Sequence, residues 1–302
     1  MDMTPAEAAR ARPDHVGVAR TLADLYALDR ARRPDLLVLA GGLAGPGVPE
    51  ALTRPDWPLR LVTGLRLPEA HPWLFAGEAE RATPEQHRAL GPGDLERLAR
   101  AAGLDGAARG NVRCTWWIRR YDDAPDSAAG SLAFFRDLLT AQETGDLPAA
   151  LLAALVDLLA AAEACGAALF VEQVTIILAK DPGDGLTTLT PLLHADEYYG
   201  PRQTAIASLT EPGWSRRGGA LFLPTRRMCD LDALGPLDLD GVDRRLSDGP
   251  IVTPGSGDVM IYDGMIGPDG VTDRGRGVPH LSADRAGDSA RLVVLMRHVP
   301  PG

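Results

Sequence analysis

The sequence predicts an α+β fold, and two features carry the prediction. Apolar residues recur at helical spacing before Gly166, and short apolar runs separated by turn sequences such as PGDG, EPGW and PGSG follow it. The runs are ALFVEQVTIILAK, LLHADEYY, TAIASL, GALFL, DVMIY, GVPHLS and RLVVLMRHV. Seven or eight antiparallel strands in roughly 130 residues can close into a double-stranded β-helix, the jelly roll. We expect such a core, flanked by N-terminal and packing helices.

One domain is predicted for the whole chain, residues 1–302, a length that allows a sizeable core. Residues 1–110 are a mixed N-terminal region of helical stretches and Pro- or Gly-rich connections. Residues 111–166 supply a strand and flanking helices, and residues 167–302 supply the jelly-roll core. Within the N-terminal region the run DLLVLAGGLAGPG is predicted to be a loop, because its glycines do not fit the GxGxxG spacing of a phosphate-binding turn.

The segment that precedes the core is predicted to hold one strand and two helices. NVRCTWWIRRY, which starts at Asn111, is rich in aromatic and β-branched residues and predicts a strand, with Trp116 and Trp117 as packing residues. Two apolar helix faces follow at spacings of three or four: Leu132, Phe135 and Leu139, then Leu151, Leu155 and Leu158. Asp146 is expected to cap the second helix, and Gly166 is expected to end it.

The charge balance restricts the partners. The chain has 41 acidic residues against 31 Lys and Arg, a formal charge of -10, which argues against nucleic acid or an anionic membrane as the main partner. The opening MDMTPAEAARARPD has no apolar stretch of signal-peptide length, and no later stretch is long enough to cross a bilayer. We therefore expect a cytoplasmic protein whose partner is a small molecule.

The motif HAD and one distant histidine suggest a metal site. Side chains two residues apart in a strand point to the same side, so His194 and Asp196 are expected to project together into the barrel. His280, in GVPHLS, can join them because a jelly roll brings distant strands side by side. Two imidazoles and one carboxylate form the facial triad that holds non-haem Fe(II) and leaves open positions. Zinc bound by the same ligands is the catalytically inert alternative.

An arginine near the end of the chain suggests an anionic cosubstrate. In RLVVLMRH, Arg291 shares one strand face with Val293 and Leu295 and is the only charge among them. A guanidinium matches a carboxylate with two parallel hydrogen bonds, and an unpaired buried charge is costly, so a dicarboxylate that chelates the iron at its other end explains the placement. A surface arginine or an internal salt bridge is the plainer alternative.

The ordered pieces from about residue 190 to 298 resemble the Fe(II)/2-oxoglutarate-dependent dioxygenases. The pieces are HAD, GGALFLP, TPGSGDVMIY, His280 and then Arg291. The family pattern is HxD, a GGxL strand, a PxxGDxxxF turn and strand, a distal His, and an Arg or Lys about ten residues later. Gly218, Gly219, Pro254, Gly257, Asp258 and Tyr262 fit the middle pieces, with Tyr262 in place of the more usual Phe.

The resemblance implies roles for individual residues. It makes His194, Asp196 and His280 the Fe(II) ligands and Arg291 the residue that binds the distal carboxylate of 2-oxoglutarate, which such enzymes convert to succinate. Related halogenases have a small residue at the position of Asp196, so hydroxylation or another oxygenation is favoured. The long segments between Leu223 and Ile251, and between Tyr262 and His280, are candidate lids over the barrel mouth.

Other polar residues are given secondary roles or none. Tyr198 follows Asp196 on the same strand face and is expected either to contact cosubstrate or substrate or to fill barrel space. Arg285, Arg297 and the histidines outside the triad are not assigned to the site; these histidines are His15, His71, His87 and His298. Six aspartates between residues 230 and 248 suit a solvated loop, or an acidic lid over a cationic substrate.

The leading hypothesis is an Fe(II)- and 2-oxoglutarate-dependent oxygenase. It is expected to use dioxygen to hydroxylate a free small molecule, such as an amino acid or a natural-product intermediate, with release of succinate and CO2. The same iron site can also support desaturation, epoxidation or ring closure, and the sequence leaves these open. A rival of another class is a non-catalytic jelly-roll protein that binds a metal or a small acid. The sequence does not specify an oligomeric state.

Overall fold

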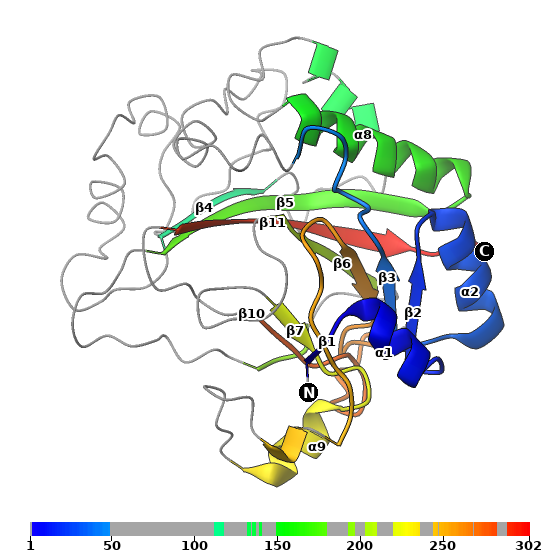
Figure 1. The fold of residues 1–302 in the computed structure, drawn as a ribbon, viewed down its shortest axis with the longest axis vertical. Helices are drawn as coiled ribbons and strands as arrows, with labels where there is room; N and C mark the ends of the chain where they lie inside the picture. Colours follow the sequence, from blue (N-terminus) through cyan, green and yellow to red (C-terminus); the bar gives the residue numbers. More distant parts are fainter. Residues whose placement is uncertain are drawn as a thin grey trace.

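The structure of the protein is a computed structural model whose strands form two β-sheets. It describes residues 2–48, 112–117, 132–133, 135–136, 139–140, 149–179, 193–196, 203–209, 220–235, 244–246, 248–267, 269–282 and 289–302. For residues 112–117, 172–179, 244, 282 and 289–291 it describes the backbone alone. Figure 1 shows the two sheets, with the long strands β5 and β11 side by side across the molecule and β7 and β10 apart from them.

The larger sheet has seven strands in the order β2-β3-β9-β6-β11-β5-β4. They are β2 (Val16–Ala19), β3 (Leu36–Leu39), β4 (Val112–Trp117), β5 (Ala168–Ala179), β6 (Gln203–Ser208), β9 (Val259–Tyr262) and β11 (Ser289–Val299). Only the pair β2 and β3 is parallel, and the other neighbours are antiparallel. Antiparallel pairing matches the turn-separated runs of the sequence.

The smaller sheet has four strands in the order β1-β8-β7-β10. They are β1 (Asp2–Met3), β7 (Ala220–Phe222), β8 (Ile251–Val252) and β10 (His280–Ser282). Beyond β10, His194 forms an isolated antiparallel bridge with His280. The first strand of the chain therefore lies at one edge of this sheet, and the HAD segment lies at the other.

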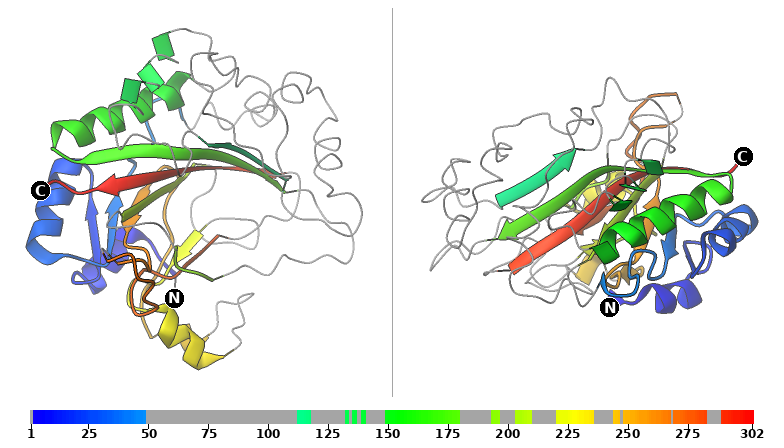
Figure 2. Two further views of the ribbon diagram at one scale, coloured as in Figure 1. Left: turned by 180° about the vertical axis from the view of Figure 1, so that it is seen from behind. Right: turned by 90° about the horizontal axis from the view of Figure 1, so that it is seen from above.

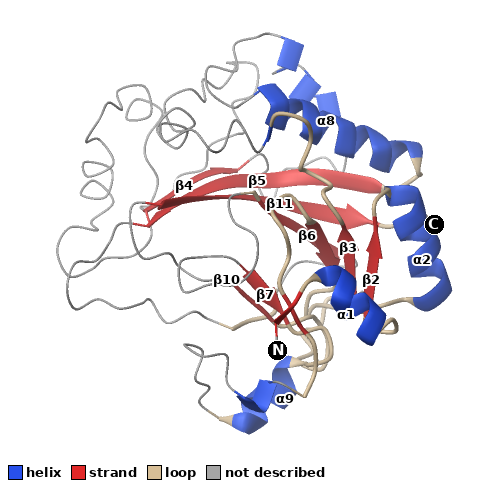
Figure 3. Ribbon diagram, viewed as in Figure 1, coloured by secondary structure: helices blue, strands red, loops and turns tan. Residues whose placement is uncertain are grey.

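Helices lie around the outside of the strands (Figure 3). They are α1 (Pro5–Ala11), α2 (Leu22–Arg32), α8 (Ala149–Ala164) and α9 (Met228–Leu234), with a short 3-10 turn, η2 (Arg244–Leu246). Figure 2 shows α8 lying along one face of the larger sheet. Within the described part of the chain, none of the helices has the length and hydropathy that a membrane crossing requires.

Three apolar clusters fill the spaces between these layers. One lies between the sheets and includes Val38, Phe222 and Tyr262. A second joins the outer face of the larger sheet to α2 and α8, and the third covers the outer face of the smaller sheet beneath α9 and η2. Strand β11 illustrates the division: Leu292 and Val294 belong to the α8 cluster, so the alternate residues face the space between the sheets.

The middle of the chain confirms the helix and strand predictions wherever it is described. β4 forms within the segment predicted to be a strand, and α8 buries Leu151, Leu155 and Leu158. Gly166 adopts a φ of +73°, its N–H donates to Glu163 O, and the next N–H donates to Ala162 O. This is the Schellman arrangement that ends a helix. Leu132 and Phe135 are helical and buried, whereas Asp146 lies outside the described residues.

The N-terminal region differs from its prediction. Leu36–Leu39, predicted as part of a loop, is strand β3 of the larger sheet, and β1 and β2 add further strands. Strands from residues before 167 thus belong to both sheets, so the β-structure is not confined to residues 167–302. Five apolar residues, 36–40, precede the two glycines, and a run this short does not specify a strand without its partner.

The motif residues Gly257 and Asp258 build a turn. Asp258 Oδ2 accepts from Gly255 N at 2.7 Å, and its Oδ1 accepts from Gly41 N at 2.8 Å. Gly257 has a φ of +79°, and a Cβ atom there would lie 2.7 Å from Ala44 N. These contacts join the turn before β9 to the loop after β3, so this part of the motif serves the fold.

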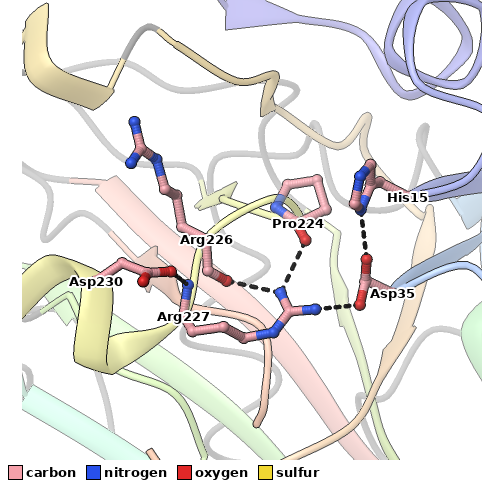
Figure 4. A network of polar contacts seen from close by, with 6 residues as sticks. All are labelled: His15, Asp35, Pro224, Arg226, Arg227 and Asp230. Carbon is pink, nitrogen blue, oxygen red and sulfur yellow. Dashed lines mark hydrogen bonds and ion pairs between the residues drawn. The ribbon is translucent and has the colours of Figure 1, made fainter. Parts of the chain in front are cut away.

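A polar network ties the start of β3 to α9 (Figure 4). His15 Nδ1 lies 2.6 Å from Asp35 Oδ2, and Arg227 forms an ion pair with the other oxygen of Asp35. The same guanidinium donates to Pro224 O at 3.0 Å and to Arg226 O at 2.8 Å. The N-terminal end of α9 is thereby fixed to the N-terminal region.

A second polar contact is buried beside α2. His298 is 1% exposed, its Nδ1 lies 2.9 Å from Gln203 Oε1, and its Nε2 lies 2.9 Å from Tyr26 Oη. A neutral imidazole that donates from Nδ1 and accepts at Nε2 satisfies both contacts. Burial lowers the pKa of His298 from its ordinary 6.5 to about 4.

We predict that Gly257→Ala destabilises the fold by about 1–3 kcal/mol, through the left-handed backbone and the contact with Ala44. The midpoint of urea unfolding measures the change. Gly270→Ala is the matched control, because Gly270 has a φ of +76° and nothing lies within 4 Å of its Cβ position. Equal losses in the two variants would show that the contact with Ala44 contributes nothing.

We also predict that acid destabilises the protein through His298. Between pH 6.5 and about 4 the unfolded chain binds a proton at His298 that the folded chain does not. The free energy of unfolding therefore decreases as the pH is lowered across this window, by up to about 3 kcal/mol. Urea unfolding at several pH values should give a shallower slope for His298→Gln than for the wild type, and unchanged slopes would contradict the assignment.

Candidate metal centre

One antiparallel bridge brings two histidines side by side. His194 N donates to His280 O at 3.0 Å, and His280 N donates to His194 O at 2.7 Å. Residues paired in this way project their side chains to the same side of the sheet, and the two ring centroids lie 4.4 Å apart. The prediction that His194 and His280 meet across strands is confirmed. Within residues 193–196, however, the HAD segment forms this single bridge rather than a longer strand.

Asp196 completes a group of three metal-binding side chains. One ligand atom from each of His194, Asp196 and His280 lies within 4.8 Å of the others. Asp196 Oδ1 is 3.9 Å from His194 Nε2 and 3.7 Å from His280 Nε2. The backbone of Asp196 is fixed as well, because its carbonyl accepts from Met265 N at 2.8 Å. A His–Asp–His triad is therefore present, with its ligand atoms turned toward one point.

The triad has a closed side and an open side. The side chains of His280 and Asp196 are 5% and 11% exposed, whereas that of His194 is 50% exposed. The open side lies at His194, at the edge of the smaller sheet. Solvent can therefore reach the side chain of His194, while the fold encloses the other two side chains.

The tautomer of His280 suits metal binding. Its Nδ1 lies 3.0 Å from the carbonyl oxygen of Val278, which can only accept a hydrogen bond, so Nδ1 carries the proton. Nε2 then presents a lone pair on the side of Asp196. A histidine ligand commonly donates its other ring N–H to a backbone carbonyl in this way, which fixes the ring orientation.

Two aromatic residues pack against the imidazole of His280. Phe222 stacks on the imidazole with centroids 5.2 Å apart, and the Tyr262 ring lies 5.0 Å from it at a tilt of 56°. The Tyr262 hydroxyl donates to Asp196 Oδ2 at 2.8 Å. Sequence reasoning treated Tyr262 only as a motif match. The signal that was missed is the hydroxyl itself, the one polar group in the buried strand VMIY.

The segment between Tyr262 and His280 is fastened at both ends. Near its start, Met265 N donates to Asp196 O, and Asp273 N donates to Met265 O at 2.8 Å. Farther along, both Nε and Nη2 of Arg274 lie 2.7 Å from the carboxylate of Asp232 in α9. The two segments named as candidate lids are thus joined to each other by this ion pair, and their role as lids stays a prediction.

The other predicted site residues are only partly described. Arg291 pairs through its backbone with Ile177 of β5, and its side chain lies outside the described residues. Tyr198 also lies outside them, as do Arg285, His71 and His87. Of the residues not assigned to the site, His15 contacts Asp35 and His298 contacts Tyr26, both away from the triad.

The chemistry of the donor set fits a divalent transition metal. Two neutral imidazoles and one carboxylate on one face of the metal leave the opposite face open for a chelating cosubstrate and dioxygen. The proton on Nδ1 of His280 and the half-exposed His194 agree with this use. The residues that can hold the metal are therefore His194, Asp196 and His280, as the sequence predicted.

No protein-family model matches the sequence, and no curated protein matches it. Among solved structures, similarity is found to the non-heme alpha ketoglutarate dependent epimerase SnoN from nogalamycin biosynthesis, at 18% identity over 91% of this chain and 81% of that chain, with a TM-score of 0.36. The dioxygenase for auxin oxidation in rice matches at 13% identity over 98% of this chain and 79% of that one, with a TM-score of 0.37. AviO1 from Streptomyces viridochromogenes Tue57 matches at 14% identity over 94% of this chain and 97% of that one, with a TM-score of 0.39. Likenesses this weak carry no argument about activity, which rests on the residues of the site.

We predict that His280→Ala and Asp196→Ala each weaken Co(II) binding by at least about 100-fold. Losing a residue that only hydrogen-bonds a metal ligand already lowers metal affinity by about 10–100-fold, and losing the ligand itself lowers it more. Isothermal titration calorimetry measures the affinity. His15→Ala is the control, because it removes a histidine that pairs with Asp35 away from the triad. If the control loses as much affinity as the triad variants, the metal does not bind at the triad.

Proposed function

We propose that the protein is a non-haem oxygenase that uses Fe(II) and 2-oxoglutarate to oxidise a small molecule. The observation that carries the proposal is the convergence of His194, Asp196 and His280, with ligand atoms within 4.8 Å of one another and one side reachable from solvent. Bound Fe(II) supplies the redox chemistry by which dioxygen oxidises the substrate while 2-oxoglutarate becomes succinate and CO2.

We propose that the two sheets are the two halves of a double-stranded β-helix within a single domain. In support, the larger sheet contains the adjacent strands β9, β6, β11 and β5, and the smaller sheet contains the adjacent strands β8, β7 and β10, with the HAD segment next to β10. Jelly rolls alternate successive strands between two sheets in this way. The triad then lies at the edge where the HAD segment meets β10.

For the distal carboxylate of 2-oxoglutarate we propose Arg291 as the partner. In support, position 291 follows the strand alternation of Val293 and Leu295, whose neighbours Leu292 and Val294 belong to the cluster on the opposite face. An arginine on the inner face offers the paired donors that a carboxylate accepts. Tyr198, two residues beyond Asp196, is proposed as a secondary contact for cosubstrate or substrate.

Arg297 is the second candidate for this carboxylate. It is buried and pairs across the sheet with Thr204, which in turn pairs with Tyr262. The hydroxyl of Thr204 is buried and has no hydrogen-bond partner among the described residues. Positions 291 and 297 are separated by roughly 20 Å at about 3.3 Å per residue, so only one of them can bind a given carboxylate.

The substrate is proposed to be a free small molecule in the cytoplasm, such as an amino acid or a natural-product intermediate, and the reaction is proposed to be hydroxylation. The formal charge of -10 supports a neutral or cationic partner over a polyanion. Desaturation, epoxidation and ring closure use the same ligands and differ in substrate placement. A non-catalytic protein that binds a metal or a small acid is the rival.

We predict that anaerobic addition of Fe(II) and 2-oxoglutarate produces a visible charge-transfer absorption, because the 2-oxo acid chelates the iron. In air the same mixture should release succinate, at least slowly, and His194→Ala should abolish both signals. If 2-oxoglutarate chelates the iron but releases no succinate in the presence of any candidate substrate, the non-catalytic rival is favoured. Absence of both signals from folded wild-type protein would exclude the proposed function.

We predict further that Arg291→Gln weakens 2-oxoglutarate binding by at least about 10-fold, because a charge-assisted hydrogen-bonded pair is lost. Titration of the anaerobic absorption measures this affinity. Thr204→Val and Arg297→Gln test the second candidate, with thermal unfolding as the check that each variant is folded. Loss of affinity in these variants, with Arg291→Gln unchanged, would transfer the role to Arg297.

A further inference from the structure

A tyrosine hydroxyl touches one oxygen of the triad's carboxylate. Tyr262 ends β9 and is 1% exposed. Its hydroxyl lies 2.8 Å from Asp196 Oδ2 and 3.4 Å from His280 Nε2. The hydroxyl has one proton, and both neighbours are acceptors, because the proton of the imidazole is on Nδ1. The hydroxyl therefore donates its hydrogen bond to the carboxylate, since hydrogen bonds to charged acceptors are shorter and stronger.

The two oxygens of Asp196 therefore have different surroundings. Oδ1 lies between the imidazoles, 3.9 Å from His194 Nε2 and 3.7 Å from His280 Nε2. Oδ2 is turned toward β9, where it accepts a hydrogen bond from the Tyr262 hydroxyl. Only Oδ1 faces the point where the ligand atoms converge.

Neighbouring structure fixes the Tyr262 ring. The residue is paired in the larger sheet between Leu36 and Thr204. Phe222, from the smaller sheet, meets its ring edge to face with centroids 5.3 Å apart. The hydroxyl is consequently held in place from both sheets and does not depend on a mobile side chain.

We propose that Tyr262 is a positioning residue that keeps Asp196 a ligand through one oxygen. A carboxylate can bind a metal through one oxygen or through both. Binding through both would occupy a position on the face that a chelating cosubstrate and dioxygen must share. By engaging Oδ2, the phenol reserves that face. The inference rests on the proposed function, and it assigns Tyr262 a role that acts through Asp196 rather than on the substrate.

The experiment compares Tyr262→Phe with Tyr26→Phe. Each change removes one buried phenol that contacts a histidine nitrogen, but Tyr26 contacts His298, outside the triad. Co(II) is the probe, because its absorption intensity reports coordination number. We measure the Co(II) spectrum, the Co(II) dissociation constant and the affinity of the Co(II)-loaded protein for 2-oxoglutarate.

We expect Tyr262→Phe to alter the Co(II) spectrum and to weaken 2-oxoglutarate binding by about 10-fold or more, the range found for outer contacts of metal ligands. Tyr26→Phe should match the wild type in all three measurements. A spectrum and an affinity unchanged in Tyr262→Phe, or changed equally in both variants, would overturn the proposal. So would an intense visible band of the ferric wild type that Tyr262→Phe loses, because the phenol would then itself be a ligand.

The two failures are distinguishable. If the wild type binds neither Co(II) nor 2-oxoglutarate, the proposed function fails and the role of Tyr262 fails with it. If the wild type binds both and Tyr262→Phe behaves identically, the proposed function stands and only the positioning role is lost.

Discussion

The site depends on one pair of backbone hydrogen bonds, those that His194 and His280 exchange at 3.0 and 2.7 Å. Residues far apart in the chain become direct neighbours through this pair, and their rings are set on the same side of the sheet. The spacing of Asp196 from His194 then adds the carboxylate. A shift of one residue in this pairing would turn the imidazoles to opposite faces and dissolve the triad.

The fold supplies rigidity on the buried side of that pair. His280 is held by Val278 through Nδ1 and by Phe222 and Tyr262 through their rings. These two aromatic residues belong to the cluster between the sheets, so packing and ligand geometry are properties of the same side chains. On the other side of the triad, the side chain of His194 is 50% exposed, so exchangeable ligands can approach from there.

Polar contacts outside the site connect elements that the sheets alone would not fix. Asp258 joins two turns through Gly41 and Gly255, and Asp35 links His15 to Arg227 at the start of α9. Arg274 and Asp232 fasten the segment that leads to His280. The N-terminal region is therefore part of the framework around the site, both through its strands and through these charges.

The sequence by itself determined the α+β class, helix α8 with its glycine end, and the three side chains of the triad, because periods of two and 3.6 residues and the HxD spacing are local. Only tertiary structure decided that Leu36–Leu39 is a strand and that Tyr262 contacts Asp196. Short strands are specified by their partners rather than by their own residues, and a hydrogen bond between residues 66 positions apart leaves no periodic trace in the chain.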